Sequence, residues 1–254
     1  MILNSLVTGE GPSVVLLHGL FGAARNLGVI ARALSGTARV VSLDLRNHGD
    51  SPHGAAMDFS TMAADVAETM HSLRLTRASI VGHSLGGKTA MVLALTQPRL
   101  VERLVVMDIA PVSYHHDYAD YVAAMRAIEL RPGLVRHEAD TALAQVVEEP
   151  PMRAFLLNNL VLGDAPRWRI GLKEIAQAMP DLVRWDDPLD THPFTGPTLF
   201  LRGGDSHYVQ PEADAVIARL FPNAERETVA GASHWLHADK PQQVIASLKG
   251  FLGL

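Results

Sequence analysis

The chain has 254 residues, of which 48% are hydrophobic and 19% are charged, with 20 glycines and 15 prolines. These proportions exclude the disordered, collagen-like and coiled-coil classes and indicate a soluble globular protein with a sizeable core. The formal net charge of −5 argues against a nucleic-acid partner, and the absence of cysteine excludes disulfides, cysteine-ligated metal sites and a thiol nucleophile.

Short apolar segments rich in Val, Ile and Leu alternate along the chain with segments of helical periodicity. Strands are predicted over Val14–Leu17, Arg39–Leu43, Ala78–Val81, Leu104–Asp108, Thr198–Leu201 and Glu225–Val229. Helices are predicted over Leu27–Leu34, Ser60–Leu73 with Ser60 as N-cap, Leu85–Thr96, Pro211–Phe221 and Pro241–Phe251. This alternation predicts an α/β fold with a mostly parallel sheet flanked by helices.

The alternation stops between about Pro111 and Pro188. Four helix-like segments follow one another there without a convincing strand: Tyr118–Leu130, His137–Glu148, Met152–Leu160 and Leu172–Met179. Prolines and a glycine then break the chain before the alternation resumes. We therefore predict a core formed by residues 1–110 and 188–254, with a helical cap inserted over residues 111–187.

Residues 82–86 read Gly-His-Ser-Leu-Gly, a G-x-S-x-G pattern between a predicted strand and a predicted helix. In a sharp strand-to-helix turn the central residue is exposed and its neighbours must be small, so Ser84 is a candidate nucleophile. The backbone N–H of Leu85 would then face a bound substrate. A serine hydroxyl needs a nearby base, so the pattern alone does not establish the chemistry.

The same residues also satisfy a phosphate-binding pattern, because Gly82 is followed by Gly87-Lys88-Thr89. Asp108 at a strand end resembles a magnesium ligand in that alternative. However, two predicted strands precede this loop, whereas a P-loop normally follows an early strand. A solvated or helix-capping lysine is the simpler interpretation of Lys88.

Two further loops follow predicted strands. His18-Gly19-Leu20-Phe21-Gly22 can bring a second backbone N–H to the site, from Leu20 in preference to Phe21. His234 follows the last strand and so lies at the same sheet edge as Ser84, where it is the best candidate base. Metal sites at His115-His116 or at His234 and His237 lack a carboxylate-flanked cluster, and we expect neither a metal nor a cofactor.

The chain order of serine, aspartate and histidine on an α/β alternation resembles the α/β-hydrolase family. Five motifs in register resemble, more closely, the bacterial YbfF-type esterases and their mitochondrial α/β-hydrolase-domain relatives; the motifs are His18–Gly22, Asp44–Pro52, Gly82–Lys88, Asp108–Val112 and Gly231–Ala238. The resemblance implies a cofactor-free ester or thioester hydrolase with a small helical cap over a hydrophobic tunnel. It also assigns Lys88 to the family's serine turn.

Two aspartates are candidates for the third member of a catalytic triad. Asp205 follows the strand Thr198–Leu201, where most α/β-hydrolases carry their acid. Asp108 ends the strand before the insertion, at the position that the YbfF-type resemblance implies. We favour Asp108 and keep Asp205 as the alternative.

The sequence thus predicts a serine ester hydrolase with Ser84 as nucleophile, His234 as base and Leu85 and Leu20 as oxyanion donors. The expected substrate is a small to medium apolar acyl ester or thioester, and candidate pocket residues in the insertion are Tyr118, Tyr121, Met125, Met152, Phe155, Trp168 and Trp185. Another reaction on the same fold, such as C–C hydrolysis, a lyase or a haloperoxidase reaction, and a non-catalytic binding protein are the alternatives. No secretion signal or stretch of 18 apolar residues is present, so we expect a cytoplasmic protein without membrane association.

Overall fold

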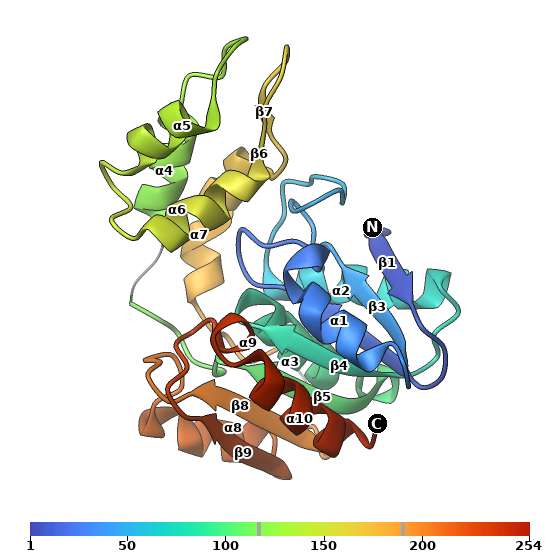
Figure 1. The fold of residues 1–254 in the computed structure, drawn as a ribbon. Coiled ribbons are helices and arrows are strands. Elements are labelled where there is room, and N and C mark those ends of the chain that lie inside the picture. The colour runs from blue at the N-terminus through green and yellow to red at the C-terminus, as the bar shows by residue number, and fades with distance from the viewer. Residues whose placement is uncertain (116–117, 189–190) are drawn as a thin grey trace.

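The computed structural model describes residues 1–115, 118–188 and 191–254, and these residues contain a seven-stranded sheet (Figure 1). The strand order is β1-β3-β2-β4-β5-β8-β9, and only the β1–β3 pair is antiparallel. The strands are β1 (Ser5–Thr8), β2 (Ser13–Leu17), β3 (Arg39–Leu43), β4 (Ala78–His83), β5 (Val101–Met107), β8 (Thr198–Gly203) and β9 (Ala224–Val229). The predicted mostly parallel sheet is confirmed.

Helices cover both faces of the sheet because successive strand residues point to opposite sides. Val14 and Leu16 of β2 belong to one apolar cluster, together with residues of α1 (Gly28–Leu34) and α10 (Pro241–Leu252). Val15 and Leu17 belong to a second cluster, with residues of α2 (Phe59–Ser72), α3 (Leu85–Thr96) and α8 (Asp214–Leu220). Burial on both faces explains why these strands are continuously apolar in sequence.

The chain between β5 and β8 forms a group of helices that stands apart from the sheet helices (Figure 1). It comprises α4 (Ala119–Ala127), α5 (Arg136–Leu143), α6 (Pro150–Leu156) and α7 (Leu172–Val183). A two-stranded hairpin, β6 (Leu160–Val161) and β7 (Arg167–Trp168), interrupts them. The sequence analysis predicted no strand here, because two-residue strands leave no readable alternation.

Short elements complete the described chain. Four 3-10 turns, η1 (Ala24–Leu27), η2 (Pro98–Leu100), η3 (Leu157–Asn159) and η4 (Pro211–Ala213), and the single-turn helix α9 (Leu236–Asp239) are present in the described residues. No helix within the described ranges is both long and apolar enough to cross a bilayer.

Two predictions about local structure were incomplete or wrong. Strand β1 was not predicted, since it is an exposed edge strand in which Leu6 and Val7 face solvent. Helix α2 begins one residue before Ser60, and its N-cap is Asp58, whose carboxylate accepts the N–H of Thr61 at 2.7 Å. An aspartate caps as well as a serine does, so the sequence alone could not separate the two positions.

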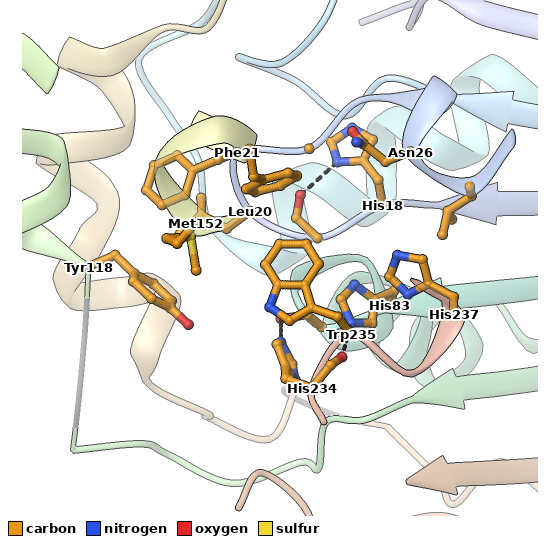
Figure 2. A pocket seen from close by; sticks show the side chains of 15 residues that line it. His18, Leu20, Phe21, Asn26, His83, Tyr118, Met152, His234, Trp235 and His237 are labelled. Carbon is orange, nitrogen blue, oxygen red and sulfur yellow. Dashed lines mark hydrogen bonds between the residues drawn. The ribbon is translucent and has the colours of Figure 1, made fainter. Parts of the chain in front are cut away.

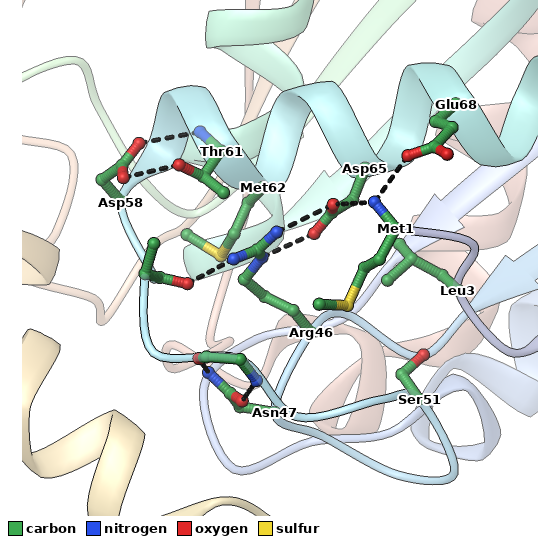
Figure 3. A network of polar contacts seen from close by, with 12 residues as sticks. Met1, Leu3, Arg46, Asn47, Ser51, Asp58, Thr61, Met62, Asp65 and Glu68 are labelled. Atoms are coloured by element: carbon green, nitrogen blue, oxygen red, sulfur yellow. Dashed lines mark hydrogen bonds and ion pairs between the residues drawn. The ribbon is translucent and has the colours of Figure 1, made fainter.

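A buried ion pair fixes the loop that follows β3 against helix α2 (Figure 3). The guanidinium of Arg46 contacts the carboxylate of Asp65 through two hydrogen bonds of 2.5 and 2.8 Å, and both side chains are buried. A bidentate pair of this kind fixes orientation as well as distance. The same loop carries His48, so the pair also holds the part of the loop that reaches the site described next.

Candidate active site

Ser84 occupies the sharp turn between β4 and α3. Its φ of +53° is unusual for a residue with a side chain, and the flanking backbone is crowded. A Cβ at Gly82 would lie 2.2 Å from the carbonyl oxygen of Gly86, and a Cβ at Gly86 would lie 2.4 Å from that of Leu17. Both positions therefore require glycine, which explains the spacing of the G-x-S-x-G pattern.

His234 lies on the loop between β9 and α9 and contacts both Ser84 and Asp108. Its Nε2 is 3.0 Å from Ser84 Oγ, and its Nδ1 is 2.7 Å from Asp108 Oδ2. Because a carboxylate accepts, Nδ1 carries the proton and Nε2 is free to accept from the serine hydroxyl. The backbone carbonyl of His234 accepts a hydrogen bond from His83 Nε2 at 2.8 Å, which holds the loop in place.

Asp108 stands directly after β5 and is fully buried. Besides His234, its carboxylate accepts hydrogen bonds from the N–H of Gly203 at 2.8 Å and from the Ser206 hydroxyl. Asp205 is exposed, and its own N–H donates to the carbonyl of Ala232. Within the described residues, the structure brings Asp108 to His234 and leaves Asp205 outside this contact.

Two backbone N–H groups beside Ser84 lack an acceptor in the part of the chain that the structure describes. They belong to Leu85, at the start of α3, and Leu20, in the turn after β2. The N–H of Phe21 is instead taken by His48 Nε2 at 3.1 Å. Leu20 and Phe21 were the two candidates for the second oxyanion donor, and of these the N–H of Leu20 is the one available to a ligand.

Burial keeps the histidines beneath this turn neutral. It lowers the pKa of His48 to about 3 and also lowers the pKa of His18. A neutral imidazole can accept from a backbone amide, as His48 does from Phe21 and His18 does from Leu45. These two rings therefore support the turn that presents the amide of Leu20.

Two pockets meet at Ser84. The first, which we call the histidine pocket, includes His234 and His83 together with His18, Phe21, Asn26, Met152, Phe155 and Trp235 (Figure 2). The second, the lysine pocket, is lined by Lys88 and by apolar side chains, including Phe59, Ile109, Met179 and Leu182. Ser84, Leu20 and Tyr118 line both pockets, so a substrate bound at Ser84 can extend in two directions.

Several side chains of the inserted helices reach these pockets. Of the predicted residues, Tyr118, Met152 and Phe155 line the histidine pocket, and Tyr121 lines an apolar groove that continues outward from it. Met125 is instead buried among the inserted helices, and Trp168 and Trp185 line neither the two pockets nor the groove. Met179 and Leu182 of α7, which line the lysine pocket, were not predicted.

Lys88 was expected to be a solvated or a helix-capping lysine; it is buried, so the first of these interpretations is wrong and the second is correct. Its amino group donates to the backbone carbonyls of Arg184 at 2.9 Å and Val183 at 3.4 Å, at the end of α7. It therefore caps a neighbouring helix rather than facing a phosphate loop.

His116, which was considered with His115 as a metal site, lies outside the described residues.

Comparison with known proteins agrees with the geometry of this site. The model of the alpha/beta hydrolase fold family matches residues 12–241. The chain belongs to this family. The α/β-hydrolase resemblance drawn from the chain order of serine, aspartate and histidine is thereby confirmed.

Similar proteins are named esterases or lipases. The sn-1-specific diacylglycerol lipase ABHD11 of Mus musculus is 44% identical over 98% of this chain and 84% of its own. Esterase YbfF of Escherichia coli is 36% identical over 94% of this chain and 92% of its own. A solved structure, "Marine microorganism esterase", superposes with a TM-score of 0.95 at 34% identity and covers 99% of each chain. The prediction of an ester-hydrolysing enzyme is confirmed.

Sequence reasoning missed two residues that shape the α/β-hydrolase site. Ser206 bonds Asp108, and Tyr208 stacks on the His234 ring at a centroid distance of 3.9 Å. The hydroxyl of Tyr208 also contacts that of Tyr118 at 2.7 Å, which joins the insertion to the core above the site. Their only signal in the sequence is their place after β8, which they share with the candidate acid Asp205.

Proposed function

We propose that the protein is a serine carboxylic ester hydrolase that works through an acyl-enzyme at Ser84. The observation that carries this proposal is the continuous hydrogen-bonded series from Ser84 Oγ to His234 and on to Asp108. In it, His234 Nε2 takes the serine proton as Oγ attacks the acyl carbonyl, and Asp108 holds the ring and stabilises the imidazolium. Asp205 plays no part in this assignment.

The developing oxyanion would be held by the N–H groups of Leu85 and Leu20. Each such donor contributes about 3 kcal/mol to transition-state stabilisation in enzymes of this mechanism. His234 then returns its proton to the leaving oxygen or sulfur as the bond from that atom to the carbonyl carbon breaks. A water molecule repeats the attack on the acyl-enzyme and releases the acid and free Ser84.

The two pockets suggest where each part of the substrate binds. The leaving group must contact His234, which donates the proton to it, and His234 lines the histidine pocket but not the lysine pocket. We therefore assign the histidine pocket to the leaving group and the lysine pocket to the acyl group. Residues 111–187 act as the cap that encloses both, which favours small to medium acyl groups over polymeric substrates.

Labelling with an alkyl fluorophosphonate tests the nucleophile. We expect rapid stoichiometric inactivation, with the phosphonyl group found on the peptide that contains Ser84 by mass spectrometry. Wild-type protein unfolded in urea provides the control, because an isolated serine hydroxyl reacts slowly. A folded protein that hydrolyses no simple ester and takes up no label would be a binding protein rather than a serine hydrolase.

Enlarging one methionine in each pocket tests the assignment of acyl and leaving groups. Met179 lines only the lysine pocket, whereas Met152 lines the histidine pocket and its outer groove. Met179→Trp should lower kcat/KM for octanoyl relative to acetyl esters by about tenfold or more, because a filled apolar pocket discriminates by chain length. Met152→Trp should instead change the preference among alcohols. If Met179→Trp changed the preference among alcohols and Met152→Trp changed the preference for acyl length, the two pockets would have the opposite roles.

A further inference from the structure

The floor of the lysine pocket carries a lysine that has no negatively charged partner among the described residues. Lys88 is 2% exposed and forms no ion pair within residues 1–115, 118–188 and 191–254. Its described partners are two backbone carbonyls and the faces of the Phe59 and Tyr114 rings, 5.2 and 4.9 Å from the amino group. All of these partners are neutral.

A buried cation without a negatively charged partner is costly, and the protein relieves this cost only in part. Burial lowers the pKa of Lys88 to about 7, which is the expected response to loss of hydration. The other described residues that line this pocket carry no formal charge. An ammonium group has three N–H donors, and the carbonyls of Val183 and Arg184 account for two. Among the described residues, the third donor has no oxygen acceptor and can donate to a ligand in the pocket.

The position of Lys88 relative to Ser84 is fixed by helix α3. Ser84 is the N-cap of α3, and the backbone N–H of Lys88 donates to the carbonyl of Ser84 at 3.0 Å, which closes the first turn of the helix. Both side chains line the lysine pocket. A group anchored at one end by Ser84 could therefore reach the amino group within the same pocket, where the carbonyls of Val183 and Arg184 hold it.

We infer that Lys88 binds the free carboxylate of the acyl group, so that the enzyme accepts half-esters of short dicarboxylic acids. This inference rests on the proposed function, since it takes the lysine pocket as the acyl pocket. The carboxylate would supply the missing counter-ion and a hydrogen-bond acceptor at once, which makes a strong charge-assisted contact. The apolar walls between Ser84 and Lys88 would hold the methylene chain.

The test compares two series of ethyl esters by the release of ethanol. One series is the monoethyl esters of succinic, glutaric, adipic and pimelic acid, and the other is ethyl esters of straight-chain fatty acids with the same number of acyl heavy atoms. For the wild type we expect the ratio of kcat/KM values, half-ester over neutral ester, to peak at one chain length. In Lys88→Met, a neutral side chain of similar length, the ratio at that length should fall about tenfold or more and the peak should disappear.

Lys173→Met is the matched control, because Lys173 is an exposed lysine on α7 and its loss removes the same charge from the surface. Its ratio should equal that of the wild type. Should Lys88→Met fail to fold, inhibition of the wild type gives the same information: the dicarboxylic acid of the preferred length should inhibit at least tenfold more tightly than the matching fatty acid.

The outcomes separate the inference from the proposed function. If neutral ethyl esters are cleaved but the ratio is flat with chain length and unchanged in Lys88→Met, the carboxylate site is refuted and the esterase stands. Equal inhibition by the two kinds of acid would refute it as well. If the wild type cleaves neither series, the esterase proposal itself fails.

Discussion

Ser84→Ala is expected to lower kcat for ester hydrolysis about a millionfold, since the hydroxyl is the attacking atom and no other group can replace it. The fold should survive. The strained backbone at residue 84 depends on the glycines at 82 and 86, and alanine adopts it about as well as serine does. The measurements are turnover of a short-chain ester and the free energy of unfolding in urea.

Ser72→Ala provides the control for Ser84→Ala. Ser72 ends helix α2 and is exposed, and within the described part of the chain its hydroxyl donates to the carbonyl of Thr69 alone. Turnover by this variant should match the wild type. Residual activity of Ser84→Ala within tenfold of the parent enzyme, with purity verified, would exclude Ser84 as the nucleophile.

Asp108→Asn should lower kcat about ten-thousandfold, whereas Asp205→Asn should remain close to the wild type. The Asp108 carboxylate accepts the Nδ1 proton of His234, and this fixes the tautomer whose Nε2 accepts from Ser84. An amide in the same place can donate to Nδ1 instead, which moves the ring proton to Nε2 and blocks the proton transfer. Turnover of both variants on one ester gives the comparison.

The paired variants also decide between the two candidate acids. A severe loss in Asp205→Asn with a mild one in Asp108→Asn would place the acid after β8, contrary to the contact made by Asp108. Modest losses in each variant and collapse in the double variant would show that the carboxylates replace one another. The exposed position of Asp205 argues instead for the expected result, in which only Asp108→Asn causes a severe loss.

The sheet and its flanking helices were predictable because burial on both faces leaves a strong signal in sequence. Strand β3 and helix α3 have the predicted bounds, and the other predicted core elements differ by a few residues at their ends. Elements without that signal were not predicted. Strand β1 is exposed at a sheet edge, and hairpin β6–β7 has two residues in each strand, so neither shows a readable pattern.

The site was predictable where it follows from chain order and sheet topology. Ser84, His234 and Asp108 all follow strands, and the carboxyl ends of parallel strands meet at one edge. Two features could not be derived this way. The choice between Asp108 and Asp205 depends on side-chain direction at the ends of adjacent strands β5 and β8, and burial of Lys88 depends on α7, which is about 95 residues away in the chain.

Asp108 also stands where the chain leaves the sheet, and this has a consequence for any exchange of the inserted helices between relatives. The next two residues also contribute to the site: Ile109 forms a wall of the lysine pocket, and the N–H of Ala110 donates to the hydroxyl of Tyr114 at 3.0 Å. A graft that joined foreign sequence at the sheet edge would disturb the histidine's partner along with the pocket. The incoming junction must therefore lie beyond Tyr114, so each chimaera inherits the first few residues of its insertion from the parent that supplies the sheet.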